Sequence, residues 1–487
     1  MNIKLSKKKL YSKIFVLLFV SIFTINTPSL AESSVSNQIA NLFAKSGISK
    51  ESSSISVINI KTGQKLYDYN SNKPLAPASN MKLITSAAAL ALLKPEHKFK
   101  TAIYKDSNID GGYLSGNVYL KSFGDPDLTT ERLWKMVRKF KNTGVVEIGG
   151  NIIADDSYFD QKTTGEGWRV SDYGDSVYSA RISALSLNRN TVEVWLRSGG
   201  KAGSKGVVTL DPENDFFQID NQTVTGGGYS DLIVSRTVLP DGKNKIIVKG
   251  YVPVNGHYEN TKINLDNPSI YTAYVFKKLL EKEGIKVKGT VKRGVTPSGA
   301  EEVVSSNSRT LSAIVYDFNK HSVNFIGEIL LKYLGAYFKG APGNAQKGAE
   351  IIKKEFFEKI LKTDSKALVI ADGSGLSPLN RITAGHFIKV LDYMYKDFGY
   401  QSDYIASLPL SGADGTLRKR TRKTAGERKF KAKTGFINGV SCLSGYTFTK
   451  DGEPIAFSIM MNNFSNMYSA ISAQDEICTF LANTSLK

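Results

Sequence analysis

A buried helix is predicted by the stretch Pro77-Ala-Ser-Asn-Met-Lys-Leu-Ile-Thr-Ser-Ala-Ala-Ala-Leu-Ala-Leu-Leu93. Proline precedes an Ala- and Leu-rich run that ends just before Pro95, an arrangement typical of a helix start and stop. Ser79 and Lys82 stand three residues apart, so a helix places both side chains on one face. Lys82 can then accept the proton of the Ser79 hydroxyl, which makes Ser79 a candidate nucleophile. The free N–H groups at the start of such a helix would stabilise an oxyanion.

A lysine that acts as a base must be neutral, and a neighbouring cation helps to lower its pKa. Two Lys-Thr-Gly triplets offer that second lysine. Lys61-Thr-Gly63 lies in the predicted turn of a hairpin formed by residues 54–60 and 64–69, whereas Lys433-Thr-Gly435 leads into an apolar strand. The second triplet is favoured. Lys433 and Thr434 would hold an anionic carboxylate, and Gly435 would admit a substrate backbone to the strand edge.

A Ser-x-Asn triplet would complete the set, with a hydroxyl as proton relay and an amide as substrate clamp. Three triplets compete for this role. Ser186-Leu-Asn188 falls in the middle of the chain and Ser305-Ser-Asn307 in a linker, but Ser322-Val-Asn324 lies between two stretches of helical periodicity. Ser322 and Asn324 are therefore preferred.

The composition is that of ordinary folded protein. The chain has 487 residues, of which 41% are hydrophobic and 22% charged, and its length allows about two to four domains. Two cysteines, Cys442 and Cys478, cannot build a disulfide framework, and free thiols are favoured over a bridge between them. Four scattered histidines show no metal-ligand spacing, so a metalloenzyme is not expected.

The N-terminus resembles a secretory leader. Residues 1–31 carry five lysines, then the apolar run Ile14 to Phe23, then Pro28-Ser-Leu-Ala31 with small residues before a cleavage point. The run is short for a spanning helix, so a signal peptide and a periplasmic or other extracytoplasmic location are expected, with at most peripheral membrane association. The formal net charge is +19, and export favours an anionic cell-wall polymer over nucleic acid as the partner of a basic protein.

The texture of the chain changes twice. Residues 101–300 are rich in Gly, Asn, Asp and alternating β-branched residues, with helical stretches near 130–142 and 270–284. Helical periodicity returns after about residue 308, and residues 440–449 and 454–461 read as strands before a C-terminal helix. These patterns predict a strand-rich α+β region, after which a second, helix-containing part of the chain begins.

These motifs resemble those of the D-alanyl-D-alanine carboxypeptidase/endopeptidases of the DacB type, the class C low-molecular-mass penicillin-binding proteins. The resemblance covers nearly all of the chain after residue 31. It rests on the three favoured motifs, Pro77-Ala-Ser-Asn-Met-Lys82, Ser322-Val-Asn324 and Lys433-Thr-Gly435. It also rests on the segments Gly124-Asp-Pro-Asp-Leu128, Ala184-Leu-Ser-Leu-Asn188, Asp372-Gly-Ser-Gly-Leu-Ser377 and Leu408-Pro-Leu-Ser-Gly-Ala-Asp-Gly-Thr-Leu417.

The resemblance implies an α/β (α+β) fold in which residues 32–100 and 301–487 form one discontinuous, β-lactamase-like transpeptidase domain, an antiparallel sheet flanked by helices. A strand-rich inserted region of one or two subdomains, residues 101–300, splits this domain, and the implied reaction needs no metal and no organic cofactor. It implies that Ser79 attacks a bond between two D-amino acids of a peptidoglycan stem peptide, and that β-lactam antibiotics acylate the same serine. The backbone N–H groups of Ser79 and Phe436 would form the oxyanion hole, with Asn324 on the substrate carbonyl. Asp155 aligns with an insert aspartate that in similar enzymes contacts the free amino end of diaminopimelate.

Three positions depart from the family pattern. Phe436 stands where a small hydroxyl residue is usual, which removes a side-chain contact to the terminal carboxylate. Val323 and Pro378 replace a usual Asp and a common Arg. These changes favour cross-linked peptides, and hence endopeptidase activity. Two rival functions remain open: a catalytically silent wall-binding protein on the same fold, and a β-lactamase or esterase.

Overall fold

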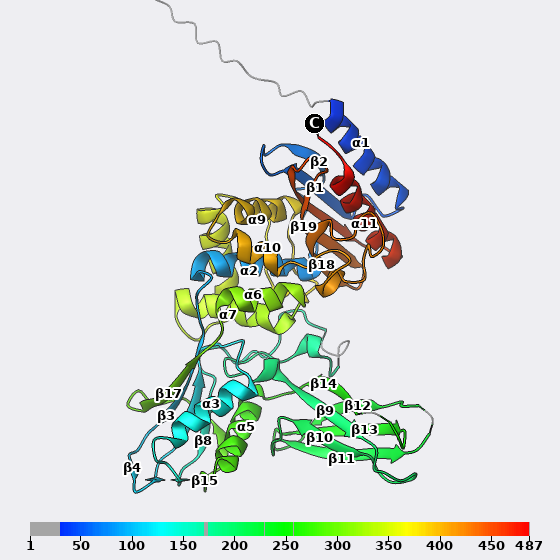
Figure 1. Cartoon of the computed structure of the whole chain (residues 1–487). Helices are drawn as coiled ribbons and strands as arrows, with labels where there is room; N and C mark the ends of the chain where they lie inside the picture. Colours follow the sequence, from blue (N-terminus) through cyan, green and yellow to red (C-terminus); the bar gives the residue numbers. More distant parts are fainter. Residues whose placement is uncertain (1–29, 170–173, 228, 257, 487) are drawn as a thin grey trace, which may run out of the picture.

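The computed structural model describes residues 30–486 apart from 170–173, 228 and 257 (Figure 1). The expected leader lies outside the described residues, except for its last two, which begin α1 (Leu30–Lys45). The upper part of the molecule in Figure 1 holds both ends of the described chain, and the lower part forms two arms.

A five-stranded antiparallel sheet lies in the upper part, in the order β18-β19-β20-β1-β2. The predicted hairpin is confirmed as its β1–β2 edge, and the two apolar strands near the C-terminus are confirmed as β19 and β20. β19 is buried along nearly its whole length because helices cover both faces of the sheet. The strands are β1 (Ser53–Asn59), β2 (Lys65–Tyr69), β18 (Phe430–Ile437), β19 (Val440–Phe448) and β20 (Pro454–Asn462).

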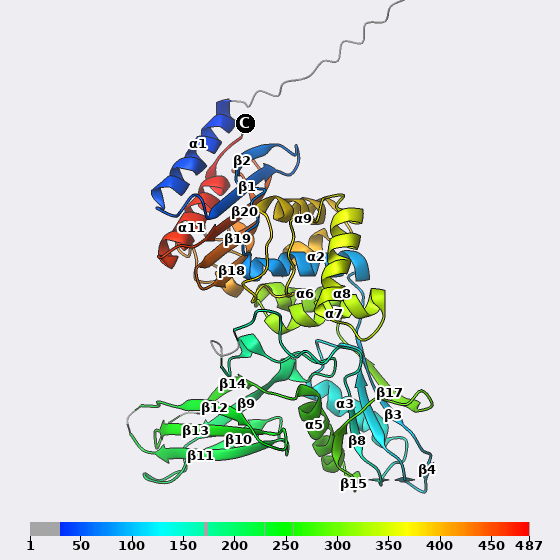
Figure 2. The ribbon, with the colours of Figure 1, turned by 180° about the vertical axis from the view of Figure 1, so that it is seen from behind.

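Helices cover the sheet on both faces (Figures 1 and 2). One face packs against α1 and α11 (Met467–Asn483), which share a hydrophobic cluster with alternate residues of β1 and β20. The other face packs against the predicted Ala- and Leu-rich helix, α2 (Met81–Leu93), which is buried on nearly every side. Around α2 lie α6 (Leu311–Lys320), α7 (Asn324–Lys339), α8 (Ala345–Ile351) with its continuation η4 (Ile352–Ile360), α9 (Ala384–Lys396) and α10 (Gln401–Ser407).

The chain leaves this part after α2 and returns before α6. The outgoing strand β3 and the returning strand β17 pair antiparallel, with Lys100 opposite Asn307, so the two crossings lie side by side. Their sheet, in the order β16-β8-β6-β3-β17, and the smaller sheet β15-β7-β5-β4 pack with helices α3 and α5 on a separate core. The elements are β3 (Lys100–Lys105), β4 (Ile109–Asp110), β5 (Tyr113–Leu114), β6 (Val118–Ser122), α3 (Thr130–Lys141), β7 (Glu147–Ile148), β8 (Ile152–Asp155), α5 (Pro268–Lys282), β15 (Lys286–Val287), β16 (Val291–Arg293) and β17 (Glu301–Asn307).

The second arm consists of two three-stranded sheets, β10-β9-β14 and β11-β13-β12. They enclose a small hydrophobic core of their own, built from β9, β13 and β14. The strands are β9 (Thr191–Arg197), β10 (Val207–Asp211), β11 (Phe217–Thr225), β12 (Ile233–Val238), β13 (Asn244–Val252) and β14 (Glu259–Asn264).

The predicted α+β class, with a strand-rich insert in an antiparallel sheet flanked by helices, is confirmed. The helices expected near 130–142 and 270–284 are α3 and α5. Because β17 pairs inside the sheet of the insert, we propose that the insert extends to Asn307, seven residues beyond the boundary drawn from the sequence.

Candidate active site

Ser79 and Lys82 meet at the start of α2. Ser79 belongs to the short 3-10 helix η1 (Ala78–Asn80), which runs directly into α2. Lys82 is fully buried, and its Nζ donates a hydrogen bond of 2.9 Å to Ser79 Oγ. The helical spacing therefore brings the candidate nucleophile and the candidate base into direct contact.

Two further acceptors fix the Lys82 side chain. Its Nζ lies 2.7 Å from Asn324 Oδ1, on α7, and 2.6 Å from the carbonyl oxygen of Ser374, in the loop after η4. Burial lowers the pKa of Lys82 to about 7, although the carboxylates of Asp372 and Glu328 oppose this shift. Near neutral pH, Lys82 can therefore exist in the unprotonated form that a general base needs.

Ser322 and Lys433 form a second contact across the site. Ser322 lies in the turn between α6 and α7 with a left-handed φ of 56°, an uncommon conformation for a residue with a side chain. Lys433 Nζ, from β18, donates 2.9 Å to Ser322 Oγ and 2.8 Å to the carbonyl of Thr434. Lys433 is fully buried, and burial together with the charge of Lys82 holds its pKa well below the usual range.

The Lys-Thr-Gly segment lies on the edge strand β18, next to η1. Gly435 has its Cα opposite Cys442 of β19, and a Cβ atom on it would stand 2.6 Å from the carbonyl oxygen of Pro77. Glycine is therefore required so that β18 can pack against the Ser79 segment, a reason that adds to the expected substrate approach. Thr434 Oγ1 donates to Thr416 Oγ1, and Phe436 is 54% exposed.

Asn324 connects the candidate base, Lys82, to the insert. Its Oδ1 accepts from Lys82, and its Nδ2 donates 2.9 Å to the carbonyl of Tyr178, in η2 (Val177–Ser179). One of the two N–H bonds of the amide remains for a substrate carbonyl.

Asp155 is not brought together with these groups. It ends β8 in the insert, where its side chain is fully buried. Its carboxylate accepts hydrogen bonds from Ser157 and from the backbone N–H of Thr296, and it lies 3.3 Å from Lys121 Nζ. Burial raises the pKa of Asp155, but these hydrogen bonds outweigh burial and lower it overall. The rejected triplets also lie elsewhere, at the β1–β2 turn (Lys61), at η3 (Asn188–Asn190) and in β17 (Ser305).

The sequence also matches a known protein family over most of its length. The model of the D-Ala-D-Ala carboxypeptidase 3 (S13) family matches residues 35–484. The chain belongs to the S13 family.

Characterised S13 relatives cover most of this chain. It is 34% identical over 446 residues to the D-alanyl-D-alanine carboxypeptidase of an Actinomadura species, covering 88% of this chain and 81% of that protein. It is 25% identical to D-alanyl-D-alanine carboxypeptidase DacB of Haemophilus influenzae, covering 84% of each. The crystal structure of penicillin-binding protein 4 from H. influenzae has the same fold, with a TM-score of 0.77, 24% identity and coverage of 91% of this chain and 99% of that one.

Three groups of this S13 chain that take part in the site had no role assigned from the sequence. They are the carbonyl of Tyr178, the carbonyl of Ser374 and the carboxylate of Glu328. The sequence shows a glycine-rich run around Ser374, and Glu328 one helical turn after Asn324. It does not show that these groups contact the site, because the contacts join segments far apart in the sequence.

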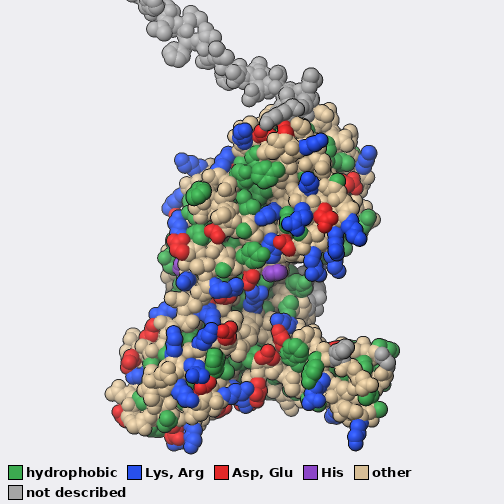
Figure 3. Space-filling view, viewed as in Figure 1, with side chains coloured by type: hydrophobic (Ala, Val, Ile, Leu, Met, Phe, Trp, Pro, Cys, Tyr) green, Lys and Arg blue, Asp and Glu red, His purple; other side chains and the backbone are tan. Residues whose placement is uncertain are grey.

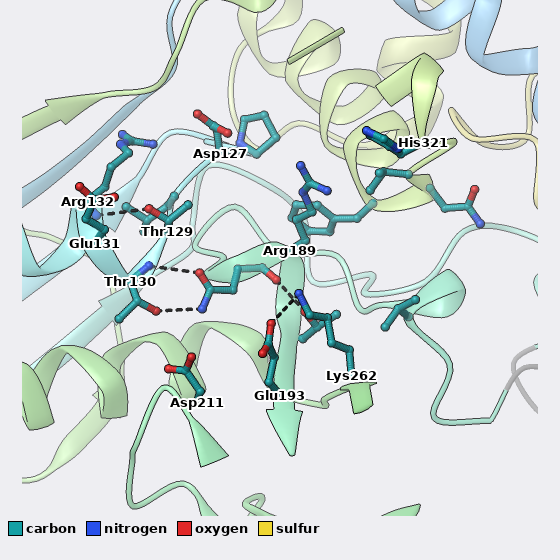
Figure 4. Close-up of a pocket in the computed structure, with 18 of the residues that line it drawn as sticks. Asp127, Thr129, Thr130, Glu131, Arg132, Arg189, Glu193, Asp211, Lys262 and His321 are labelled. Carbon is teal, nitrogen blue, oxygen red and sulfur yellow. Dashed lines mark hydrogen bonds and ion pairs between the residues drawn. The ribbon is translucent and has the colours of Figure 1, made fainter. Parts of the chain in front are cut away.

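A large pocket borders the catalytic turn. It has a volume of about 890 Å³ and extends from Ser322 and Asn324 along the insert. Figure 4 shows His321 on one side and, on the other, Asp211 and the pair formed by Glu193 and Lys262, whose charged atoms lie 2.6 Å apart. The lining combines apolar side chains with charged side chains of both signs, and the volume lies within the range of ligand pockets.

In the part of the chain that the structure describes, no group of three His, Cys, Asp or Glu residues could hold a metal ion. Within the same residues, no helix has the length and apolar character needed to span a bilayer. Both Cys442 and Cys478 are buried free thiols, as expected from the sequence.

Proposed function

We propose that this protein is a serine-type D-Ala-D-Ala carboxypeptidase, a D,D-endopeptidase or both, and that it hydrolyses peptidoglycan stem peptides through an acyl-enzyme on Ser79. The observation that carries the proposal is the 2.9 Å contact between Ser79 Oγ and a buried lysine whose pKa is lowered to about 7. Membership of the S13 family supports the same reaction.

The acylation half of the reaction uses the two lysine contacts in turn. Lys82 takes the hydroxyl proton while Ser79 Oγ attacks the carbonyl between the two D-amino acids. The backbone N–H groups of Ser79 and Phe436 stabilise the tetrahedral oxyanion. As the intermediate collapses and the C–N bond breaks, Ser322, which is hydrogen-bonded to Lys433, passes its proton to the leaving amine, and the proton that Lys82 took from Ser79 replaces it on Ser322. Water then hydrolyses the ester and restores Ser79.

Substrate binding uses hydrogen-bonding groups that are already in place at the site. The second N–H of Asn324 receives a carbonyl of the stem peptide, and Lys433 with Thr434 receives the terminal carboxylate. An arriving carboxylate favours the charged form of Lys433, so binding restores the charge that burial suppresses in the free enzyme. Phe436 offers no hydroxyl to that carboxylate, which favours a bulkier leaving group and therefore cross-linked peptides.

The cellular setting follows from the same substrate. The leader at residues 1–31 would export the protein to the periplasm or beyond the membrane, where peptidoglycan lies, and attachment to the membrane would be peripheral. β-Lactam antibiotics would acylate Ser79 and leave slowly. Contact between Asp155 and diaminopimelate stays a prediction, and it requires the side chain to give up hydrogen bonds within the insert.

The test is hydrolysis of two defined substrates by the mature protein. One is a pentapeptide stem, assayed for released D-alanine, and the other is a cross-linked muropeptide dimer, assayed for conversion to monomers. We expect cleavage of at least one substrate by the native protein and none by Ser79→Ala. A folded native protein that cleaves neither would contradict the proposal and favour the silent wall-binding alternative.

A further inference from the structure

Glu328 is a buried carboxylate that the proposed reaction does not use. It lies on α7, one helical turn after Asn324, and is 2% exposed. Its two oxygens accept hydrogen bonds from backbone N–H groups, Oε1 from Ser374 at 2.9 Å and Oε2 from Gly373 at 3.3 Å. A buried carboxylate is costly unless it is fully satisfied, so these two bonds define its place.

Ser374, whose N–H donates to Glu328, also contacts the candidate base through its carbonyl oxygen. The carbonyl oxygen of Ser374 accepts the 2.6 Å hydrogen bond from Lys82 Nζ. The chain from Glu328 to Lys82 therefore runs through one residue of backbone. α7 and this loop also meet backbone to backbone, because a Cβ on Gly373 would stand 2.1 Å from the carbonyl oxygen of Gly327. The loop can hardly move without moving the acceptor of Lys82.

The charged groups around Glu328 are few. Asp372 lies in the same loop, where it accepts from the indole of Trp168, the amide of Asn380 and the backbone N–H groups of Gly375 and Ser377. Lys82 faces it from α2, and Lys433 in turn faces Lys82 from β18. Burial and the charge of Asp372 raise the pKa of Glu328, whereas the hydrogen bonds from Gly373 and Ser374 lower it and favour its carboxylate form.

We propose that Glu328 is a positioning residue for Lys82, which aims the Ser374 carbonyl at the lysine and whose charge sets the pH range in which the lysine acts as a base. This inference rests on the proposed function. The carboxylate attracts the protonated form of Lys82, so its removal favours the neutral form. It also holds two N–H groups that a neutral amide of the same size cannot both satisfy, because the amide has one acceptor atom.

The experiment measures the second-order rate of acylation by benzylpenicillin between about pH 5.5 and 9, by intact-mass spectrometry. Glu328→Gln is expected to lower the plateau rate on the order of tenfold, the cost of about one lost charged hydrogen bond. It should also move the acid limb of the profile to lower pH. Glu328→Asp keeps the charge and shortens the side chain, so its plateau falls while the acid limb stays at the native pH.

Lys332→Met is the matched control, because Lys332 is a buried charge one turn further along α7 that binds Asp160 of the insert instead of the loop. It should lower the melting temperature and leave the profile unchanged. A lowered plateau in Glu328→Gln with an unmoved acid limb would overturn the proposal, since that is the behaviour of a simple loop anchor. If the native protein is not acylated at any pH, the proposed function fails instead.

Discussion

At the scale of single residues, two glycines allow the nucleophile to be held from both sides. Gly435 of β18 and Gly375 of the loop after η4 face the carbonyl oxygens of Pro77 and Ala78, and a Cβ on Gly375 would stand 1.8 Å from the latter. No side chain fits at either position without moving the segment that carries Ser79. The site therefore depends on backbone contacts as much as on its polar side chains.

Gly435→Ala is expected to slow benzylpenicillin acylation by about a hundredfold, because the added Cβ forces the Ser79 segment to move by up to roughly 1 Å and spoils the alignment of Ser79 with Lys82. The rate is followed by intact-mass spectrometry on folded protein. The matched control is Gly439→Ala in the β18–β19 turn, where the added Cβ meets no atom within 4 Å but φ is +73°. That variant should lose about 1 kcal/mol of stability and keep its acylation rate. Equal rates for the two variants would contradict the packing argument.

The lowered pKa of Lys82 predicts a specific pH dependence. The native acylation rate should rise about tenfold per pH unit below about pH 7 and level off above it, because the neutral lysine is the base. The same shift makes the free energy of unfolding depend on pH. Because the unfolded chain binds the Lys82 proton more tightly than the folded chain does, the contribution of Lys82 to stability increases as the pH rises above 7. A rate that falls between pH 6 and 8 would contradict this role.

At the scale of elements, the end of α6 anchors the loop that precedes β18. Lys320 is buried, and its Nζ donates to the carbonyl of Leu408 at 2.7 Å and to the carboxylate of Asp414. Ser322 follows two residues later, so this anchor sets where the catalytic turn begins. The anchor joins segments almost a hundred residues apart.

Lys320→Met should lower the free energy of unfolding by about 2 kcal/mol, since it leaves a buried carbonyl without its donor. It should also slow acylation through the displaced Ser322 turn. Urea denaturation and acylation rates measure the two effects. The exposed Lys419→Met in the same loop should change stability by less than about 0.5 kcal/mol. Unchanged stability in Lys320→Met would show that the anchor is not formed.

Local signals were enough to predict several of these elements. The helix after Pro77, the first hairpin and the turn at Ser322 each follow from short patterns of proline, glycine and apolar residues. The site residues that stayed hidden act through long-range backbone contacts. The Tyr178 carbonyl on Asn324 and the Ser374 carbonyl on Lys82 depend on tertiary packing, which periodicity does not encode. Our proposal that the insert extends to Asn307 has the same basis, because only the strand pairing reveals that β17 lies beside β3.

At the scale of the whole molecule, the site lies where the parts meet, and the core around α2 also takes in Phe159, Trp168 and Ile182 of the insert. The space-filling view shows the chain narrowing between its upper part and the two arms, with Lys and Arg side chains gathered on the upper part beside this waist (Figure 3). The exposed cations of the loop before β18 (Arg418, Lys419, Arg422 and Lys423) belong to the same part. Trp168 and Tyr178 of the insert bind Asp372 and Asn324, so the insert completes the site from one side.

This arrangement predicts an uneven response to a bound inhibitor. The sandwich of β9 to β14 has a small core, so its amides should exchange with deuterium faster than those of β19 and β20. Acylation by benzylpenicillin should slow exchange in α2 and β18 and leave β11, β12 and β13 unchanged. Hydrogen exchange with mass spectrometry gives both patterns. Equal protection in β11 to β13 would show that the outer arm is coupled to Ser79.

The most direct test of an acyl-enzyme on Ser79 is the intact mass of the protein after incubation with benzylpenicillin, measured beside Ser79→Ala. The adduct requires the nucleophile, the lysine base and the oxyanion hole at once. We expect one stable equivalent of penicilloyl ester on the native protein and none on Ser79→Ala. A folded native protein that gains no mass and hydrolyses no drug would contradict it.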